Sequence, residues 1–303
     1  MNFVIVGAGG VGGNLGARLA QAGHRVGWLV RGRSLEALRK GLELKSPLGD
    51  LSLGPQNASD DPAALGPADA VVVTVKLYDL VSLAPRLKPL SSAVFLPLQN
   101  GVDARAMLQA ALPDARVLNG MVSTKSFIEA PGRIHCKSGF SRIRLGGPGA
   151  AELAPVLESG KGVEAVVPED IDLEVWRKFV MLVSMASTTC MHRVTIGTVR
   201  EDPKMFARLM EGVNEAIAVA EREGIRFNED PKALVMSQIK DMPRDGKPSM
   251  LEDLEAGRPL EIDYFSGTIV RLGRKHGVPT PYHSAAMQAL SGTNAKQGQT
   301  TIR

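Results

Sequence analysis

The sequence predicts an α/β half built on a parallel sheet, followed by an all-helical half. Three observations indicate this fold class: short β-type runs alternate with helical stretches before residue 170, a glycine-rich turn directly follows the first run, and long helical patterns fill the remainder. Because domains usually contain roughly 100 to 200 residues, the 303 residues indicate two domains, which we place at residues 1–170 and 171–303.

In the first half, apolar and β-branched runs predict strands buried on both faces of a parallel sheet. The expected strands are Phe3–Val6, Arg25–Val30, Ala70–Val75, Ala93–Pro97 and Arg116–Val122, with a helix over Asn14–Ala22. In the second half, apolar residues at helical spacing predict helices, one of which starts at the N-cap and first-turn proline pair Asp202-Pro203. These helices are Leu173–Met185, Pro203–Glu223, Pro231–Lys240, Ile262–His276 and Pro281–Leu290.

Composition narrows the class of protein. The content of 44% hydrophobic and 22% charged residues is typical of a globular protein. No apolar run approaches the about 20 residues of a membrane span, and Phe3–Val6 leads into a glycine turn, which favours a strand over a signal peptide. We therefore expect a cytoplasmic protein without membrane contact. Scattered cations and 4% aromatic residues disfavour nucleic acid as a partner. Cys136 and Cys190 lack metal or redox spacing, so neither disulfide nor metal site is expected. His283 is expected near a helix end, capping or exposed.

The segment Gly-Ala-Gly-Gly-Val-Gly at residues 7–12 follows the first strand and opens a helix. In this context the pattern predicts a Rossmann dinucleotide-binding unit rather than a flexible glycine loop. Gly7 permits the tight turn, Gly9 lets the backbone approach the pyrophosphate, and Gly12 lets the helix pack close to the strand. We therefore assign to the cofactor site Gly7, Gly9, Gly10, Val11 and Gly12.

The end of the second strand favours NADP(H) over NAD(H). NAD enzymes usually carry an acid here that binds the ribose 2′-hydroxyl, whereas Val30 is followed by Arg31 and no acid precedes Glu36. Arg31 can bind a 2′-phosphate in a forked, charge-assisted geometry, helped by Ser34 or Arg33. A solvated surface arginine is the alternative interpretation.

Three further residues are candidates for the reaction site. Lys76 and Asn100 follow two later strand patterns, and ligands of open α/β sheets collect outside the carboxyl ends of strands. Ordinary turn chemistry is the alternative for both. Lys178 begins the helical half, and a lysine that faces an apolar cleft loses its charge readily and can donate a proton. A solvated lysine is the ordinary alternative.

Together the motifs resemble those of the ketopantoate reductases (2-dehydropantoate 2-reductases), in family order over nearly the whole chain. The residues that carry the resemblance are the glycine turn, Val75-Lys76, Gln99-Asn100-Gly101, Trp176-Arg177-Lys178, Ser249-Met250 with Asp253, Glu261-Ile262-Asp263 and Gly277-Val278-Pro279-Thr280-Pro281. The resemblance implies a Rossmann doubly wound parallel sheet followed by an all-helical C-terminal domain like that of 6-phosphogluconate dehydrogenase, with the active site in the cleft between them.

The resemblance also implies a reaction, the NADPH-dependent reduction of ketopantoate to pantoate in pantothenate biosynthesis. Lys178 matches the family's proton donor, and Glu261 matches the glutamate that positions the substrate and its lysine partner. Asn100 and Ser249 match substrate-contacting positions, and Lys76 matches a residue close to cofactor and substrate. The oligomeric state is left open, a homodimer included.

Three positions depart from the family pattern. Leu182 and Ala186 stand where the family usually has asparagines, and Ser266 replaces the asparagine of an Asn-Gly pair. Because lost amides change which substrate groups can be satisfied, reduction of a different 2-oxo acid by the same chemistry stays open. A non-catalytic NADP(H) sensor is a further alternative, which the joint presence of Lys178, Glu261 and Asn100 disfavours.

Overall fold

The structure is a computed structural model that describes residues 1–297. It divides into two compact units, which we call the α/β unit and the helical unit. The α/β unit comprises Met1–Asn100 and Ala104–Glu174, and the helical unit comprises Gly101–Asp103 and the chain from Val175 onward. The predicted fold class, a parallel sheet followed by helices, is confirmed.

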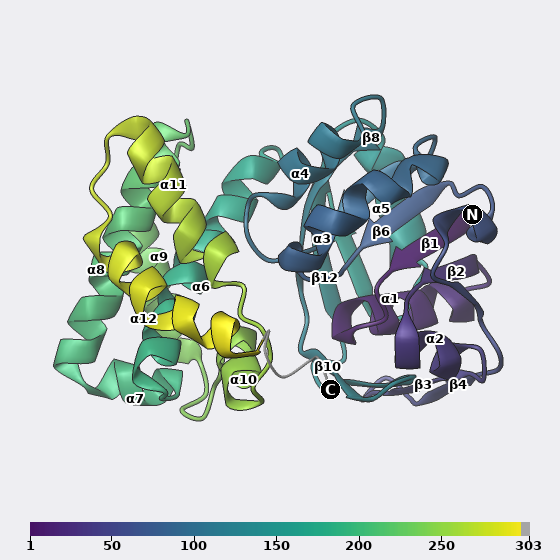
Figure 1. Cartoon of the computed structure of the whole chain (residues 1–303), viewed down its shortest axis with the longest axis horizontal. Coiled ribbons are helices and arrows are strands. Elements are labelled where there is room, and N and C mark those ends of the chain that lie inside the picture. The colour runs from purple at the N-terminus through teal and green to yellow at the C-terminus, as the bar shows by residue number, and fades with distance from the viewer. Residues whose placement is uncertain (298–303) are drawn as a thin grey trace. The chain divides into compact units, whose positions relative to one another are not determined.

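A six-stranded parallel sheet forms the centre of the α/β unit, with the order β5-β2-β1-β6-β7-β8 (Figure 1). Its strands are β1 (Asn2–Val6), β2 (Arg25–Leu29), β5 (Asn57–Ser59), β6 (Ala70–Val73), β7 (Val94–Pro97) and β8 (Arg116–Val117). Every residue of β6 and β7 is buried, as expected of strands covered on both faces. The strands predicted over Phe3–Val6, Arg25–Val30, Ala70–Val75 and Ala93–Pro97 are therefore confirmed.

Helices and two smaller sheets surround this sheet. The helices are α1 (Gly10–Gln21), α2 (Gly32–Leu38), η1 (Pro62–Leu65), α3 (Leu77–Leu83), η2 (Ala84–Leu90), α4 (Ala104–Ala111) and α5 (Ala150–Glu158). A four-stranded sheet, in the order β10-β11-β3-β4, contains β3 (Leu42–Lys45), β4 (Leu51–Leu53), β10 (Ser126–Ala130) and β11 (Arg133–Cys136). A three-stranded sheet, in the order β13-β12-β9, contains β9 (Asn119–Ser123), β12 (Ser141–Gly146) and β13 (Val163–Val166).

The single strand predicted over Arg116–Val122 is wrong in extent. The chain leaves the parallel sheet after β8, and β9 instead pairs antiparallel with β12. Gly120 permits the change of sheet, because a Cβ at this position would lie 2.6 Å from a Leu96 methyl carbon and 2.9 Å from the Pro97 carbonyl oxygen. The apolar residues of this stretch are interrupted at Asn119-Gly120, where the chain changes from one sheet to the other.

The helical unit contains a bundle around α8, which packs against α7, α9, α11 and α12 (Figure 1). The helices are α6 (Ile171–His192), α7 (Ile196–Glu201), α8 (Pro203–Arg222), α9 (Pro231–Asp241), α10 (Ser249–Glu255), η3 (Ile262–Tyr264), α11 (Ser266–His276) and α12 (Pro281–Gln297). The predicted start of α8 is confirmed, since the Asp202 carboxylate accepts hydrogen bonds from the backbone of Lys204 and Met205.

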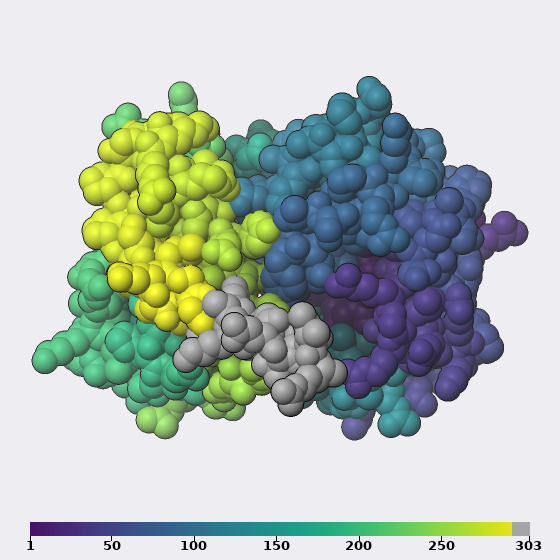
Figure 2. Space-filling view, viewed as in Figure 1, coloured from purple at the N-terminus to yellow at the C-terminus, as the bar shows by residue number. Residues whose placement is uncertain are grey.

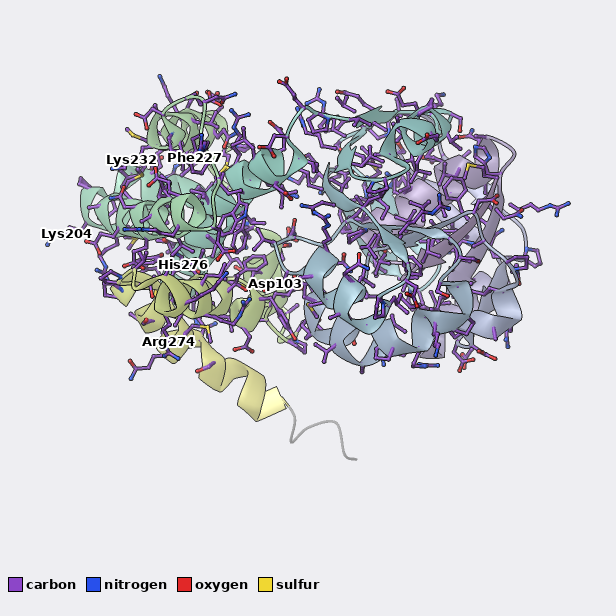
Figure 3. All side chains as sticks on the ribbon, turned by 90° about the horizontal axis from the view of Figure 1, so that it is seen from above. Asp103, Lys204, Phe227, Lys232, Arg274 and His276 are labelled. Atoms are coloured by element: carbon purple, nitrogen blue, oxygen red, sulfur yellow. The ribbon has the colours of Figure 1, made fainter. Side chains whose placement is uncertain are left out.

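The helix predicted over Ile262–His276 is divided into η3 and α11 at Phe265, whose backbone leaves the helical region (φ −103°, ψ −94°). Asp103 holds the first half of α11, because it accepts hydrogen bonds from Thr268 and Arg271. At the other end, His276 and Lys275 contact the carboxylate of Glu223, the C-cap residue of α8. Figure 3 labels Asp103 and His276, which lie toward opposite ends of this helix.

The expectation that His283 caps a helix or lies exposed is wrong. Its side chain is fully buried, and its Nε2–H donates to the Gly212 carbonyl oxygen at 3.1 Å. Nδ1 is then the acceptor, so the Ser266 hydroxyl donates to it at 2.9 Å. Ser266 in turn accepts from the Ser187 hydroxyl at 2.8 Å. A chain of hydrogen bonds thus joins α6, α11, α12 and α8 inside the core.

This burial makes stability depend on pH. Loss of solvation lowers the pKa of His283 from 6.5 to about 4. Between these values the unfolded chain binds a proton that the folded chain does not, so stability falls as pH falls. We expect the free energy of unfolding to drop by about 2 kcal/mol between pH 7.5 and pH 5 through this residue.

The measurement is urea unfolding followed by circular dichroism at both pH values. In the non-titrating variant His283→Gln the drop should be smaller by that amount, whatever its stability at pH 7.5. An equal drop in both proteins would contradict the assignment.

Candidate functional site

The glycine turn lies at the carboxyl end of β1. Gly7 has a positive φ of +94°, and a Cβ there would stand 2.9 Å from a Val75 methyl carbon. The Thr74 hydroxyl donates to the carbonyl oxygens of Val6 and Gly7, at 3.0 and 2.9 Å. Gly9 is the N-cap of α1, with no side-chain cap and no acid in the first helical turn. The turn therefore brings an uncapped helix N-terminus to the edge of the sheet.

The glycines of the turn differ in what surrounds them. A Cβ at Gly12 would lie 2.1 Å from the Gly7 carbonyl oxygen, and one at Gly10 would lie 2.1 Å from the Ser126 carbonyl oxygen of β10. At Gly9 a Cβ would meet no atom within 4 Å. Gly10 and Gly12 thus allow helix α1 to pack closely, whereas Gly9 leaves open space beside the backbone.

A pocket of about 290 Å³ opens beside this turn. Figure 2 shows a hollow between the purple atoms of the first residues and the blue atoms of the segment after β6. Among the predicted cofactor residues, Gly7, Gly9 and Arg31 line the pocket. The complete lining is Gly7, Ala8, Gly9, Leu29, Val30, Arg31, Ser34, Asp60, Val75, Asp79, Ser82, Leu83, Arg86 and Ile128.

Arg31 follows β2 and has a partner that sequence analysis missed. Its guanidinium donates to the Asp79 carboxylate at 2.7 Å. Asp79 lies in the first turn of α3, the helix that follows β6 in the sequence. The absence of an acid before Glu36 therefore does not indicate which charges surround Arg31, because Asp79, which follows strand β6, supplies a carboxylate.

Lys76 and Asn100 lie at neighbouring strand ends of the α/β unit. Val73 of β6 pairs with Pro97 of β7, so each residue comes three positions after a paired strand end. Lys76 is the N-cap residue of α3. Both side chains are partly buried. The parallel register thus brings the two residues to the same edge of the sheet, as the sequence predicted.

Lys178 lies in the first half of α6, partly buried, between the buried residues Trp176 and Phe179. The rings of these two neighbours meet edge to face, with centroids 5.6 Å apart. Loss of solvation lowers the pKa of Lys178 from 10.5 to about 8. The ammonium group is consequently much more acidic than that of a surface lysine.

Glu261 lies close in the fold to the segment that carries Lys178. The ring of Phe179 contacts that of Phe265 edge to face, at a centroid distance of 6.1 Å. The Phe265 backbone N–H donates to the Glu261 carbonyl oxygen at 3.0 Å. Glu261 is 3% exposed, at the N-cap of η3. The aromatic contact therefore fixes the segment of the buried carboxylate against helix α6.

The other predicted residues of the helical unit lie on or beside α10. Ser249 is the first residue of this helix and is exposed. The Asp253 carboxylate is buried and accepts a hydrogen bond from Arg258 at 2.7 Å. Asp253 thus has a structural partner, while the Ser249 hydroxyl stands at a surface.

The three positions that depart from the family pattern are buried. Leu182 and Ala186 belong to the apolar core of the helical unit, with exposed fractions of 9% and 0%. The hydroxyl of Ser266 is engaged by Ser187 and His283. Leu182 and Ala186 therefore carry apolar side chains where the family usually has amides, and the hydroxyl of Ser266 is already hydrogen-bonded inside the protein.

The chain is similar in sequence to a family of known proteins over most of its length. The family described as "Ketopantoate reductase PanE/ApbA" matches residues 3–148, and "Ketopantoate reductase PanE/ApbA C terminal" matches residues 170–294. A 2-dehydropantoate 2-reductase of Mesorhizobium japonicum is 30% identical over 329 residues, covering 98% of this chain and 99% of the relative. The chain belongs to the ketopantoate reductase family. Members of this family are oxidoreductases that act on CH–OH donors with a pyridine nucleotide.

Solved structures agree with this membership. The PanE/ApbA family ketopantoate reductase from Ralstonia eutropha is 29% identical, with a TM-score of 0.90 over 98% of this chain and all of that one (100%). A D-mandelate dehydrogenase solved with NADH and anilino(oxo)acetate shares the fold at 20% identity, with a TM-score of 0.87 over 98% of this chain and 100% of that chain. Within residues 1–297, no helix combines the length and apolar character needed to cross a membrane.

The contrast between Gly12 and Gly9 can be tested by adding one methyl group. Gly12→Ala should destabilise the protein by about 1 to 3 kcal/mol, because the new Cβ collides with the backbone at Gly7. Gly9→Ala should change stability by less than about 0.5 kcal/mol, because its Cβ meets open space. Calorimetric unfolding of both variants measures the difference, and equal losses would contradict the packing described for α1.

Proposed function

We propose that this protein reduces 2-dehydropantoate to pantoate with NADPH, a step of pantothenate biosynthesis in the cytoplasm. The observation that carries the proposal is the pKa of about 8 at Lys178, in the position that matches the proton donor of the family. General acids work best when their pKa lies near the working pH. A lysine in ordinary solvent, with a pKa near 10.4, gives up its proton much less readily.

The residues at the end of β1 fit a dinucleotide. An uncapped helix N-terminus without acids in its first turn favours an anion such as a pyrophosphate. The space beside Gly9 leaves room for close approach to the backbone. Arg31, at the pocket, would bind the 2′-phosphate, and Lys76 and Asn100 would lie near the nicotinamide end. When bound, the cofactor supplies a hydride to the carbonyl carbon of the substrate.

The chain itself supplies the proton and the positioning. The Lys178 ammonium group donates a proton from Nζ to the substrate's carbonyl oxygen, and its charge stabilises the negative charge that develops there. Glu261 positions the substrate and its lysine partner, and Asn100 and Ser249 contact the substrate. After turnover the neutral amine takes a proton from solvent, which its partial exposure permits.

Replacement of Lys178 tests the proposal. In Lys178→Ala we expect kcat for ketopantoate reduction to fall by about 10²- to 10⁴-fold, the usual worth of a general acid. The dissociation constant of NADPH should stay within about twofold, because Lys178 is assigned to the substrate and not to the pocket beside the glycine turn. For the wild type, log kcat/KM of reduction should decline above about pH 8, as Lys178 of the free enzyme loses its proton.

The matched control is Lys204→Ala, which removes an exposed lysine of the helical unit (Figure 3) and should leave both constants unchanged. A Lys178→Ala protein that keeps its turnover would overturn the catalytic assignment. It would favour instead a sensor that binds NADP(H) without chemistry.

A second candidate, reduction of a more apolar 2-oxo acid, is favoured by the apolar side chains of Leu182 and Ala186. A pocket that lacks amides loses hydrogen bonds to a substrate hydroxyl, the group that separates ketopantoate from simple 2-oxo acids. NADPH oxidation with ketopantoate, 2-oxoisovalerate and phenylglyoxylate would decide between the two. If kcat/KM for ketopantoate is the highest of the three, the first proposal stands, and if it is tenfold below another, the second replaces it.

A further inference from the structure

The cofactor pocket has no net positive charge, although it is expected to take an additional phosphate. Arg31 and Arg86 line it, and so do Asp60 and Asp79. The Arg86 guanidinium donates to the Asp60 backbone carbonyl at 2.8 Å, and the Arg31 guanidinium donates to the Asp79 carboxylate at 2.7 Å. A 2′-phosphate, which carries close to two negative charges near neutral pH, would therefore meet arginines that already have partners.

The Arg31–Asp79 pair spans the turn that follows β1. In the sheet order β2-β1-β6, Arg31 comes just after β2 and Asp79 lies in the helix just after β6. Neighbouring strands are about 4.8 Å apart, so these two strand ends are separated by about 10 Å. The long arginine side chain closes that gap, and the ion pair passes beside the glycine turn between them.

The Arg31–Asp79 ion pair is weak, whereas Asp79 itself belongs to a helix. The Arg31 side chain is 79% exposed and that of Asp79 is 34% exposed. Exposed ion pairs contribute little free energy, so a phosphate can draw Arg31 away from its partner. Asp79 lies in the first turn of α3, where the helix dipole favours its negative charge. Its carboxylate therefore remains beside the incoming phosphate after the arginine has moved.

We infer that Asp79 is a specificity-determining residue for the cofactor, which limits the preference of this chain for NADP(H) over NAD(H). Its carboxylate engages Nη2 of Arg31, a donor that the 2′-phosphate would otherwise use, and it repels that phosphate. A 2′-hydroxyl meets neither obstacle, and a carboxylate can accept a hydrogen bond from it. The inference rests on the proposed binding of a nicotinamide dinucleotide in this pocket.

Isothermal titration of the whole protein with NADPH and with NADH tests the inference without any substrate. In Asp79→Asn we expect NADPH to bind about tenfold more tightly and NADH to bind within about threefold of the wild type. The ratio of the two dissociation constants should shift toward NADPH by about tenfold. A ratio that stays constant, or that shifts toward NADH, would overturn the inference.

The control variant is Glu43→Gln, which removes one carboxylate of the exposed Arg133–Glu43 pair of the same unit, outside this pocket. An equal shift in Glu43→Gln would mean that net charge alone sets the ratio, and would also overturn the inference. The proposed function fails separately: a wild-type protein that does not bind NADPH would refute it, whereas a wild type that binds NADPH leaves it standing whatever Asp79→Asn does.

Discussion

The close approach of helix α1 to the end of strand β1 is the constraint on which the α/β unit depends. No side-chain atom fits between Gly12 and the Gly7 carbonyl oxygen, and Thr74 binds that oxygen from the end of β6. Because three chain segments meet at this point, the helix N-terminus is held at the edge of the sheet. The pocket, and the side chains of Arg31 and Asp79 at its two flanking strand ends, follow from this arrangement.

In the helical unit, hydrogen bonds between buried polar groups hold the helices in place. The chain Ser187–Ser266–His283–Gly212 joins four helices in a core that is otherwise apolar. Hydrogen bonds in such surroundings are costly to leave unmade, so they favour one arrangement of these helices over others. Lys178 lies on the same helix as Ser187, and the position of its backbone is thereby set partly by contacts well away from the lysine.

Features that depend on local pattern could be predicted from the sequence, and those that depend on distant contacts could not. The glycine turn, the buried strands and the capped start of α8 each carry their signal within a few residues. The Arg31–Asp79 pair joins residues 48 positions apart, and β9 pairs with β12, a strand that follows later in the chain, instead of joining the parallel sheet. His283 lies in the first turn of α12, as expected, but its burial depends on Gly212, which is 71 positions away in the sequence. Short strands such as β4 and β5, three residues each, are below the length at which alternation is readable.

The residues that we propose for the reaction and those that we propose for the choice of cofactor lie in different parts of the chain, and their properties have different physical origins. The low pKa of Lys178 arises from the loss of solvation on burial. The environment of Arg31 is set by one carboxylate and is largely exposed to solvent. If both proposals hold, a substitution at the strand ends would change which dinucleotide is preferred and leave proton transfer intact.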